Sequence, residues 1–312
     1  MRFPKLKNRP VLVTGGAGFI GSHLVDRLVE EGARVRVLDD LSRGRIDYLE
    51  GIWERIEFIE GDIRRPEDVS KALTGIETVF HLAANTSVPR SVEDPRYDFE
   101  VNAEGTFNLL EACRLRDVGE VVYASTAAVY GEPRYTPIDE NHPTNPISPY
   151  GASKLAGEKM GAVFQSVYGL CFTTVRIFNV YGPRQSMYVM YDFMVKLSET
   201  PGRLEVLGDG GQRRCYVFTD DAVEGILVAA KNAPGEVINL SGDESVSVNE
   251  LAERMIHELS PGAEIVNTGA SWKGDIQILV GDNSKLKSKW FQPNTPLADG
   301  IRKLIEWHQS RT

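Results

Sequence analysis

The stretch TGGAGFIGSHL at residues 14–24 decides the fold of this chain. It follows an apolar run at residues 10–13, leads into an amphipathic helix, and has glycines at Gly15, Gly18 and Gly21. Such glycines let a strand turn tightly into a helix, let the backbone approach a ligand, and let helix and strand pack closely. Because the N–H groups of a helix N-terminus favour an anion, the stretch predicts a cradle for the pyrophosphate of a dinucleotide. An ordinary strand-to-helix turn is the alternative.

The next apolar run indicates which dinucleotide would bind. Val35–Leu38 is predicted to be a strand and ends in Asp39 and Asp40, where an acidic side chain accepts a hydrogen bond from a ribose 2′-hydroxyl. A carboxylate there repels a 2′-phosphate, which favours NAD over NADP. Arg43 and Arg45 follow closely, so NADP stays open as the alternative.

Length, charge and cysteine content limit the remaining possibilities. The chain has 312 residues, which suits two lobes around one cleft, and its net charge of −9 disfavours nucleic acid and anionic membranes as partners. Cys113, Cys171 and Cys215 are odd in number and lack a C-x-x-C spacing, which favours a reducing compartment. The basic N-terminus lacks a signal-peptide pattern, and no apolar run approaches membrane-spanning length. We therefore expect a cytoplasmic protein with no membrane partner.

Apolar runs and helical patterns alternate as far as residue 178. This alternation is typical of β-α-β crossovers and predicts an α/β fold with a doubly wound, Rossmann-type parallel sheet. Six strands are expected, at Val11–Val13, Val35–Leu38, Ile56–Ile59, Thr78–Leu82, Glu120–Ala124 and Phe172–Ile177. Helices are expected near Ser22–Glu31, Pro66–Leu73, Arg96–Leu115 and Pro149–Tyr168.

The pattern changes after Asn179, where prolines and glycines become frequent. Short strands are expected to alternate with helices at Tyr188–Glu199, Asp220–Lys231, Ser247–Leu259 and Leu297–Gln309. These segments predict a smaller C-terminal α/β substrate lobe that closes over the cofactor lobe. The expected NAD-binding domain comprises residues 1–178 plus about 216–240, and the substrate-binding domain comprises about 179–215 and 241–312.

Residues that directly follow the predicted strands are candidates for the site. In a doubly wound sheet the ligand lies beyond the carboxyl ends of the strands. Asp62 follows one strand and is a candidate to accept a hydrogen bond from an adenine amino group, with a helix cap or turn residue as the alternative. The small side chains of Ala83 and Ala84 would let the cofactor pass over the sheet. Ser125 and Thr126 offer hydroxyls where the nicotinamide is expected, unless they cap local backbone instead.

A second pattern that carries chemistry is Tyr150-Gly-Ala-Ser-Lys154, on a helix expected to begin near Pro149. Residues four apart share one helix face, so the ammonium group is expected beside the phenol. A phenol has a pKa near 10, and a nearby cation favours the phenolate. We therefore expect Lys154, together with a positively charged nicotinamide ring, to lower the pKa of Tyr150 and make it a base. The same spacing is common on solvated helices, and the nucleotide cradle is what favours the catalytic interpretation.

The motifs together resemble the extended short-chain dehydrogenase/reductase family. They run in order along nearly the whole chain: TGGAGFIGSHL, Asp39-Asp40, GDI at 61–63, HLAA at 81–84, VNAEGTFNLLEA from Val101, STAAVYG from Ser125, Y-x-x-x-K, and FNVYGPRQ from Phe178. Within the family the chain is most similar to NAD-dependent nucleotide-sugar epimerases, particularly those that act on UDP-glucose at C4. The resemblance implies bound NAD, a UDP-sugar substrate, and a homodimer through a four-helix interface formed by the helices expected at Arg96–Leu115 and Pro149–Tyr168.

The resemblance also assigns roles to individual residues. Tyr150 would be the base, Lys154 would hold the ribose and tune Tyr150, and Thr126 would be the hydroxyl partner. The residues expected to contact NAD are Gly15, Gly18, Phe19, Ile20, Gly21, Asp39, Asp62, Ile63, Leu82, Ala83, Ala84, Asn102, Tyr150 and Lys154. Those expected to contact the nucleotide sugar are Ser87, Arg90, Thr126, Asn179, Arg214 and Lys273. Arg90 and Arg184 are both candidates for a second anionic contact, with ordinary surface arginines as the alternative.

Two departures from the family pattern concern the diphosphate. Arg214 falls where the family places a diphosphate-binding arginine, but the next residue is Cys215 where an acidic residue is usual. Residues 272–275 read WKGD where the family often has Arg-x-Gly-Asp, so Lys273 is the candidate to replace a second arginine.

A third departure decides between reactions. Ala127 and Ala128 occupy positions where the sugar 4,6-dehydratases of the family carry an Asp-Glu pair, and similar decarboxylases tend to carry a glutamate there. Dehydration needs an acid and a base besides the tyrosine, whereas C4 epimerisation needs a hydride acceptor and one base. We therefore expect a UDP-hexose 4-epimerase of the UDP-glucose/UDP-galactose type that works through a transient 4-keto sugar. The alternatives are a UDP-glucuronate or UDP-N-acetylhexosamine 4-epimerase, another nucleotide-sugar dehydratase or reductase, and a non-catalytic NAD-binding regulator.

Overall fold

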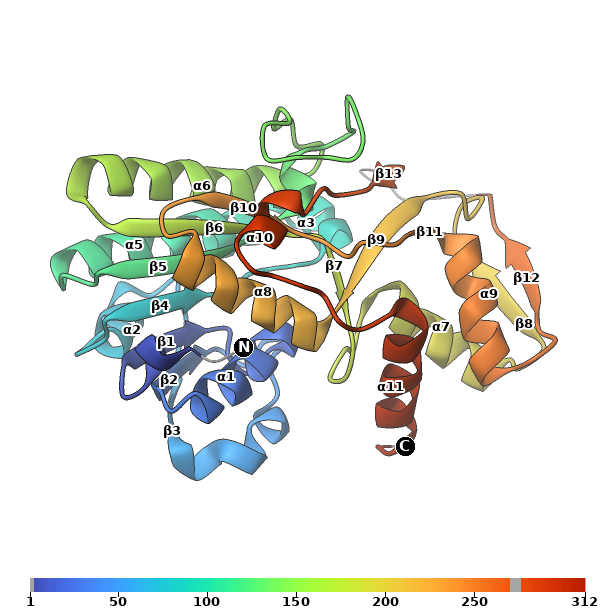
Figure 1. Cartoon of the computed structure of the whole chain (residues 1–312), viewed down its shortest axis with the longest axis horizontal. Helices are drawn as coiled ribbons and strands as arrows, with labels where there is room; N and C mark the ends of the chain where they lie inside the picture. The colour runs from blue at the N-terminus through green and yellow to red at the C-terminus, as the bar shows by residue number, and fades with distance from the viewer. Residues whose placement is uncertain (1–2, 270–275, 312) are drawn as a thin grey trace.

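The centre of the protein is a seven-stranded parallel sheet (Figure 1). The computed structural model describes residues 3–269 and 276–311. The strands lie in the order β10-β6-β5-β4-β1-β2-β3, so the chain starts near the middle of the sheet and winds outward in both directions. Their bounds are β1 Pro10–Thr14, β2 Arg34–Asp39, β3 Ile56–Glu60, β4 Thr78–His81, β5 Glu120–Thr126, β6 Cys171–Ile177 and β10 Val237–Leu240. The predicted doubly wound α/β fold is confirmed, and β10 adds a strand to the six expected.

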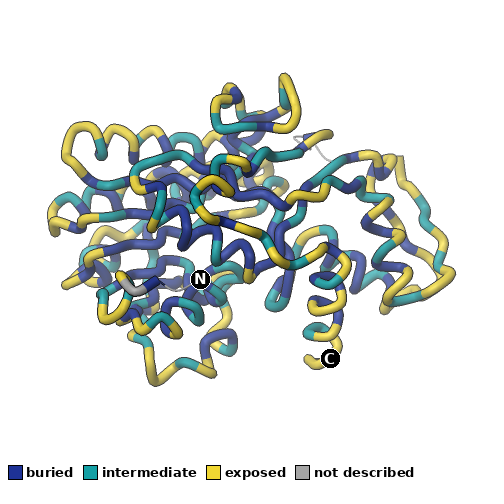
Figure 2. The backbone as a smooth tube through the Cα atoms, in the orientation of Figure 1, coloured by how far each residue is buried: buried dark blue, intermediate teal, exposed yellow. Residues whose placement is uncertain are grey.

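Helices cover both faces of this sheet. On one face α1 (Phe19–Glu30) and α8 (Thr219–Asn232) pack together over a core that includes Val11, Leu24 and Ile226. On the other face α2 (Pro66–Ala72), α5 (Gly105–Leu115) and α6 (Pro149–Tyr168) enclose a second core. Burial on both faces explains why the strands are near-continuous apolar runs rather than alternating patterns. Figure 2 shows the buried strands between the exposed outer surfaces of the helices.

The helix expected at Arg96–Leu115 is interrupted in the structure. After α3 (Val88–Glu93), a short helix α4 (Pro95–Phe99) continues into a π-helical turn, η4 (Glu100–Glu104), and only then into α5. The N–H group of Gly105 donates to the carbonyl of Glu100, five residues back, as π-helical geometry requires. The wider turn brings the side chain of Asn102 into the protein interior, where it forms several hydrogen bonds.

The C-terminal part forms two small sheets beside the large one (Figure 1). In the first, β9 (Arg213–Phe218) pairs with β7 (Asn179–Tyr181), β11 (Ser245–Ser247) and β13 (Ile278–Leu279), and in the second β8 (Arg203–Val206) pairs with β12 (Glu264–Asn267). The helices of this part are α7 Tyr188–Glu199, α9 Val248–Leu259, α10 Ser284–Ser288 and α11 Leu297–Gln309. A separate core joins α7, α9 and α11, with Phe193, Leu251 and Leu304 among its members.

Short helical turns complete the secondary structure. They are the 3-10 helices η1 Pro4–Leu6, η2 Ile46–Tyr48, η3 Glu50–Arg55 and η5 Ala127–Val129. Over the two described ranges, no helix has both the length and the hydrophobicity needed to cross a membrane.

Candidate active site

A cavity of about 460 Å³ opens at the carboxyl ends of the parallel strands. Its walls come from the segments that follow β1, β2, β3, β4, β5 and β6 and from the start of α6, with further residues from β7, α7 and β9. Most of the predicted cofactor residues line it: Gly15, Gly18, Phe19, Ile20, Gly21, Asp39, Asp62, Ile63, Leu82, Ala83, Ala84, Tyr150 and Lys154. Of the predicted substrate residues, Thr126, Asn179 and Arg214 line it. Residues far apart in the sequence therefore meet at this sheet edge.

The glycine turn between β1 and α1 has no room for side chains. Gly15 has φ +70°, and a Cβ there would lie 2.7 Å from the backbone nitrogen of Ala83. A Cβ at Gly21 would collide with the carbonyl oxygen of Gly15. α1 begins at Phe19, and its N-cap residue Gly18 offers no side-chain cap. The N-terminus of α1 is therefore bordered by main chain and faces the cavity, as an anion cradle requires.

Asp39, at the end of β2, supports the glycine turn from the side. Its two carboxylate oxygens accept hydrogen bonds from the N–H groups of Ala17 and Leu41, each at 2.9 Å. Burial raises the pKa of this carboxyl, and the two hydrogen bonds oppose that rise. Each oxygen keeps a further lone pair, so the side chain can both fix the turn and accept a hydrogen bond from a ligand.

The carboxylate of Asp62 is already bound by Arg64. The guanidinium of Arg64 donates to Oδ2 from Nε at 2.8 Å and from Nη2 at 2.6 Å. The backbone N–H group of Arg64 donates to Oδ1 at 2.8 Å. Although burial raises the pKa of Asp62, these contacts with Arg64 lower it overall. The turn role considered for Asp62 is therefore present in the structure, alongside its place on the cavity wall.

Tyr150 and Lys154 lie one helical turn apart at the start of α6. Ser148 caps this helix by accepting a hydrogen bond from Gly151 N–H at 3.1 Å, and Pro149 occupies the first helical position. The ammonium of Lys154 is buried and lies 4.1 Å from the centroid of the Tyr123 ring. Thr126, at the end of β5, accepts a hydrogen bond from Ala128 N–H at 3.2 Å, and it lines the cavity together with Tyr150. Its hydroxyl therefore caps local backbone and also borders the site.

The pKa directions differ from the sequence-based expectation. Burial raises the pKa of Tyr150 above its usual value, the neighbouring phenol of Tyr188 adds to the rise, and the Thr126 hydrogen bond opposes it. Burial lowers the pKa of Lys154 to about 7, against the carboxylates of Glu158 and Asp98, which raise it. The protein alone therefore does not create the expected phenolate beside an ammonium, because burial disfavours both charges.

Two buried polar clusters support Lys154 from behind. In one, Asp98 accepts hydrogen bonds from Ser153, Asn85 and Asn102 at 2.6, 2.8 and 3.0 Å. In the other, Glu158 pairs with Arg176 at 2.7 Å and accepts a hydrogen bond from the Ser125 hydroxyl at 2.5 Å. Each carboxylate is satisfied by several donors, as buried charges require. These clusters hold the first turns of α6 against the sheet.

Three of the predicted site residues that the structure describes do not line the cavity. Asn102 lies behind the wall, where its side chain bonds both the N–H and the carbonyl of Asn85, so it can act only through its neighbours. Ser87 caps α3 through Arg90 N–H at 3.3 Å, and the guanidinium of Arg90 stacks 4.4 Å from the centroid of the Tyr97 ring. Local capping and stacking thus account for Ser87 and Arg90. Lys273 lies outside the described residues.

Residues on the C-terminal side of the cavity are held by main-chain contacts. Asn179 donates from Nδ2 to the carbonyl of Cys215 at 3.2 Å. Arg214 donates from Nη1 to its neighbour Arg213 and to Gln277, at 2.9 and 3.2 Å, both through carbonyl oxygens. Two backbone carbonyls therefore help to hold the guanidinium of Arg214 at the cavity wall.

Comparison with known proteins places these features in a family. The model of the NAD-dependent epimerase/dehydratase family matches residues 11–241. The chain is 38% identical to a UDP-glucose 4-epimerase from Mycolicibacterium smegmatis, over 96% of this chain and 99% of that protein. It superposes with a TM-score of 0.92 on the UDP-glucose 4-epimerase of Thermotoga maritima solved with UDP-glucose, at 34% identity and covering 97% and 99% of the two chains. It also superposes on the Thermus thermophilus UDP-glucose 4-epimerase complexed with NAD, with a TM-score of 0.88 at 34% identity, covering 97% of this chain and 100% of that chain.

The chain belongs to the NAD-dependent epimerase/dehydratase family. The residues present fit the dinucleotide of this family, because the glycine turn borders the uncapped N-terminus of α1 with main chain and Asp39 adds a carboxylate to the same cavity wall. Gly15, Gly18 and Gly21 would hold the pyrophosphate and Asp39 a ribose, at the places that the sequence indicated.

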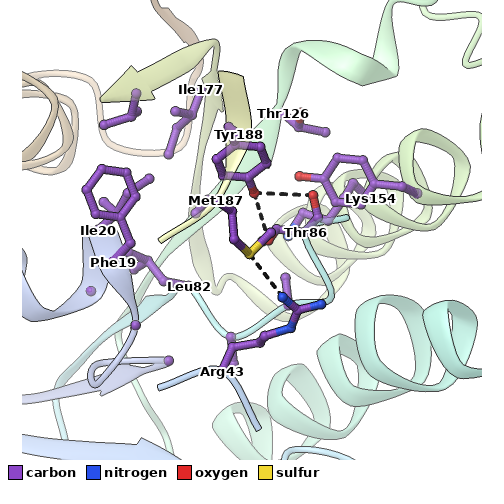
Figure 3. Close-up of a pocket in the computed structure, with 18 of the residues that line it drawn as sticks. Phe19, Ile20, Arg43, Leu82, Thr86, Thr126, Lys154, Ile177, Met187 and Tyr188 are labelled. Carbon is purple, nitrogen blue, oxygen red and sulfur yellow. Dashed lines mark hydrogen bonds between the residues drawn. The ribbon is translucent and has the colours of Figure 1, made fainter. Parts of the chain in front are cut away.

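The segment that contains Arg184 brings further residues to the site that were not predicted as site residues from the sequence. Residues 182–188, here called the strap, connect β7 to α7 and run along the mouth of the cavity. Figure 3 shows Met187 and Tyr188 of the strap reaching toward Arg43 and Thr86. The strap is fastened along its length by contacts of Pro183 O with His23 Nε2 (2.9 Å), Arg184 with Asp26 (2.7 Å), Met187 Sδ with Arg43 (3.1 Å) and the Tyr188 hydroxyl with Thr86 (2.9 Å). Residues 182–185 belong to the FNVYGPRQ motif and include the candidate Arg184, whereas no pattern in the sequence pointed to Met187 or to the side chain of Tyr188.

Proposed function

We infer that the protein is an NAD-dependent nucleotide-sugar 4-epimerase that interconverts UDP-glucose and UDP-galactose. The main support for this proposal is that Thr126, Tyr150 and Lys154 line the same cavity as the glycine turn. Ala127 and Ala128 line the same wall and offer no acid or base. The cavity therefore holds the groups needed to move one proton at a sugar hydroxyl beside a nicotinamide.

The side chains divide the work of the reaction. Tyr150 accepts the proton of the sugar 4-hydroxyl, and the Thr126 hydroxyl on the same cavity wall holds the sugar oxygen in line. Lys154 would bind the ribose and, in its protonated form one helical turn from Tyr150, stabilises the phenolate. NAD bound in the cradle would supply a hydride acceptor and a positively charged ring. The same phenol then returns its proton after the 4-keto sugar has turned over.

Rotation of the 4-keto sugar in the cavity requires that the protein bind the nucleotide tightly and the hexose weakly. Arg214 and Asn179 reach the cavity from the C-terminal part and are suited to the diphosphate, since a guanidinium binds phosphate oxygens in a bidentate manner. We assign residues 1–178 with about 216–240 to the NAD-binding domain, and about 179–215 with 241–312 to the nucleotide-sugar-binding domain, with β7 and β10 near the crossings.

A dehydratase or decarboxylase of the same family is the second candidate considered. Both reactions change the mass of the sugar, and both need an extra acid or base where Ala127 and Ala128 stand. The purified protein is therefore given UDP-glucose without added NAD, and the products are analysed by mass and by sugar stereochemistry. UDP-galactose of unchanged mass, with no net NADH, is the expected result. A product of altered mass would overturn the epimerase proposal, as would failure with UDP-glucose, UDP-N-acetylglucosamine and UDP-glucuronate alike.

We also propose a homodimer through α5 and α6. The two helices pack side by side, and their outer faces expose apolar side chains, including Phe107 on α5 and Val163 and Val167 on α6, at 45%, 54% and 63% exposure. Such a patch on two neighbouring helices suits a second copy of the same pair, forming a four-helix interface. Val163→Glu is expected to give a monomer in light scattering where the parent protein is a dimer. A monomeric parent protein would refute the interface.

The proposed compartment is the reducing cytoplasm. Cys113 and Cys215 are buried, Cys171 is partly buried, and all three are free thiols. Free thiols without disulfides support a reducing environment.

A further inference from the structure

Tyr188 has a backbone conformation that is unusual for an aromatic residue. It is the first residue of α7 and has φ +70°, in the left-handed region that glycine adopts readily and other residues rarely. The carbonyl of the preceding residue, Met187, accepts a hydrogen bond at 2.8 Å from Nε2 of Gln185, which is itself buried. The strap therefore imposes this conformation on Tyr188. Strained residues of this kind concentrate at functional sites.

The conformation directs the Tyr188 side chain across the cavity. Its hydroxyl donates to Thr86 Oγ1 at 2.9 Å, so a residue of α7 reaches the segment that follows β4 (Figure 3). Tyr150 lines the same cavity as Tyr188. Tyr188 lines the cavity and is 49% exposed, so a large part of its surface is accessible to a ligand.

We propose that Tyr188 is a substrate-positioning residue whose ring forms the wall against which the hexose of a nucleotide sugar packs. This inference rests on the proposed function. With its hydroxyl proton used on Thr86, the phenol offers an apolar face and oxygen lone pairs. A pyranose carries C–H groups on both faces, and an aromatic wall contacts either face without demanding one set of hydrogen-bond directions. Such a wall suits a sugar that must present both faces in one turnover.

The test separates the sugar from the nucleotide. Tyr188→Gly removes the ring at a position whose φ favours glycine, so the backbone is expected to keep its path. Calorimetry on the NAD-loaded protein should show affinity for UDP-glucose reduced about tenfold and affinity for UDP changed less than about twofold. In kinetics the KM for UDP-glucose should rise more than kcat falls. NAD content after gel filtration should match that of the parent protein.

Matched variants show whether the ring itself provides the affinity. Tyr188→Phe keeps the ring and loses only the bond to Thr86, so its affinity for UDP-glucose should lie between those of the parent and Tyr188→Gly. Tyr191 lies on the same helix, stacks on His308 and does not line the cavity, so Tyr191→Phe should behave as the parent. Equal losses of UDP and UDP-glucose affinity, or unchanged UDP-glucose affinity in Tyr188→Gly, would overturn the proposal. A parent protein that binds UDP-glucose but converts no nucleotide sugar would instead refute the proposed function.

Discussion

In the half of the cavity beside α1 a glycine turn brings main chain to the wall, whereas the half beside α6 presents the functional side chains of Thr126, Tyr150 and Lys154. Gly15, Gly21 and Ala83 approach one another so closely that a single added carbon has no place. Around Tyr150, by contrast, the lining groups come from β5, α6, β9 and the strap, each held by its own hydrogen bonds. Substitutions in the first half should therefore prevent NAD binding through steric clashes. Substitutions in the second half should reduce activity by removing single functional groups.

The largest effect is expected from removing the base of the side-chain half. Tyr150→Phe keeps the ring but deletes the hydroxyl, so kcat should fall about 10³-fold while NAD stays bound. Steady-state kinetics and the NAD content after gel filtration measure the two. Tyr135→Phe is the matched control, because Tyr135 is exposed, lies away from the cavity wall and bonds a neighbouring carboxylate, Asp139. A kcat loss below about tenfold for Tyr150→Phe would assign the proton to another group.

Adding a single methyl group to the glycine turn should destabilise the protein and prevent NAD binding. In Gly21→Ala the new Cβ meets the carbonyl of Gly15, and forced repacking of this kind costs about 3 kcal/mol. Urea denaturation should report that loss of unfolding free energy, and NAD should no longer co-purify. Gly51→Ala provides the control, since nothing lies within 4 Å of a Cβ at Gly51. Retention of both NAD and stability in Gly21→Ala would mean that the turn is more open than the structure has it.

Lowering the pH should destabilise the protein through His81 on β4, the strand between the two halves of the cavity. His81 is buried in β4 between Thr14 (2.7 Å) and Thr106 (3.0 Å), and burial first, then the charge of Lys154, lowers its pKa from 6.5 to about 3. Thr106 donates its own proton to Asn102 O, so His81 Nε2 must donate to Thr106 and Nδ1 accepts from Thr14. This arrangement requires the neutral ring.

The sign of the pH effect follows from that pKa. Between pH about 6.5 and about 3 the unfolded chain binds a proton that the folded protein does not, so stability falls as the pH drops, by about 1.4 kcal/mol per pH unit. His81→Gln keeps a donor and an acceptor but cannot titrate, and its unfolding free energy should depend less steeply on pH in this window. His257→Gln, at an exposed site on α9, should keep the parental slope. Identical slopes in all three proteins would show that other groups govern acid unfolding.

The smallest of these effects concerns the diphosphate. Arg214→Ala should weaken UDP binding about tenfold, equivalent to about 1.4 kcal/mol, through loss of charge-assisted hydrogen bonds. Arg213 is the natural control, because its guanidinium faces Ser245 and Glu250 and does not line the cavity. If Arg213→Ala weakens UDP binding as much as Arg214→Ala, the effect is long-range charge rather than contact.

The same contrast explains what could be predicted from sequence. The glycine turn, Asp39 and the Tyr150–Lys154 pair are local patterns, because glycine spacing and helical periodicity act over a few residues. Asn102 was placed in the site by resemblance, but the π-helical turn that directs it behind the wall leaves no simple periodicity in the sequence. Tyr188 was expected only as the start of a helix, since its importance depends on a φ value and on a contact with Thr86, distant in sequence.

The returning strand β10 has a consequence for how the protein is made. Between the end of β6 at Ile177 and the start of β10 at Val237, the growing chain builds other structure, and β6 remains an open, apolar sheet edge. Leu286 and Phe291, which pack into the same core, emerge from the ribosome later still. Nascent chains that stall within this interval expose a strand that readily pairs with another chain. We therefore expect the chain to need uninterrupted translation or chaperones until residue 291 is available, although the sequence elements of the NAD cradle lie within its first 40 residues.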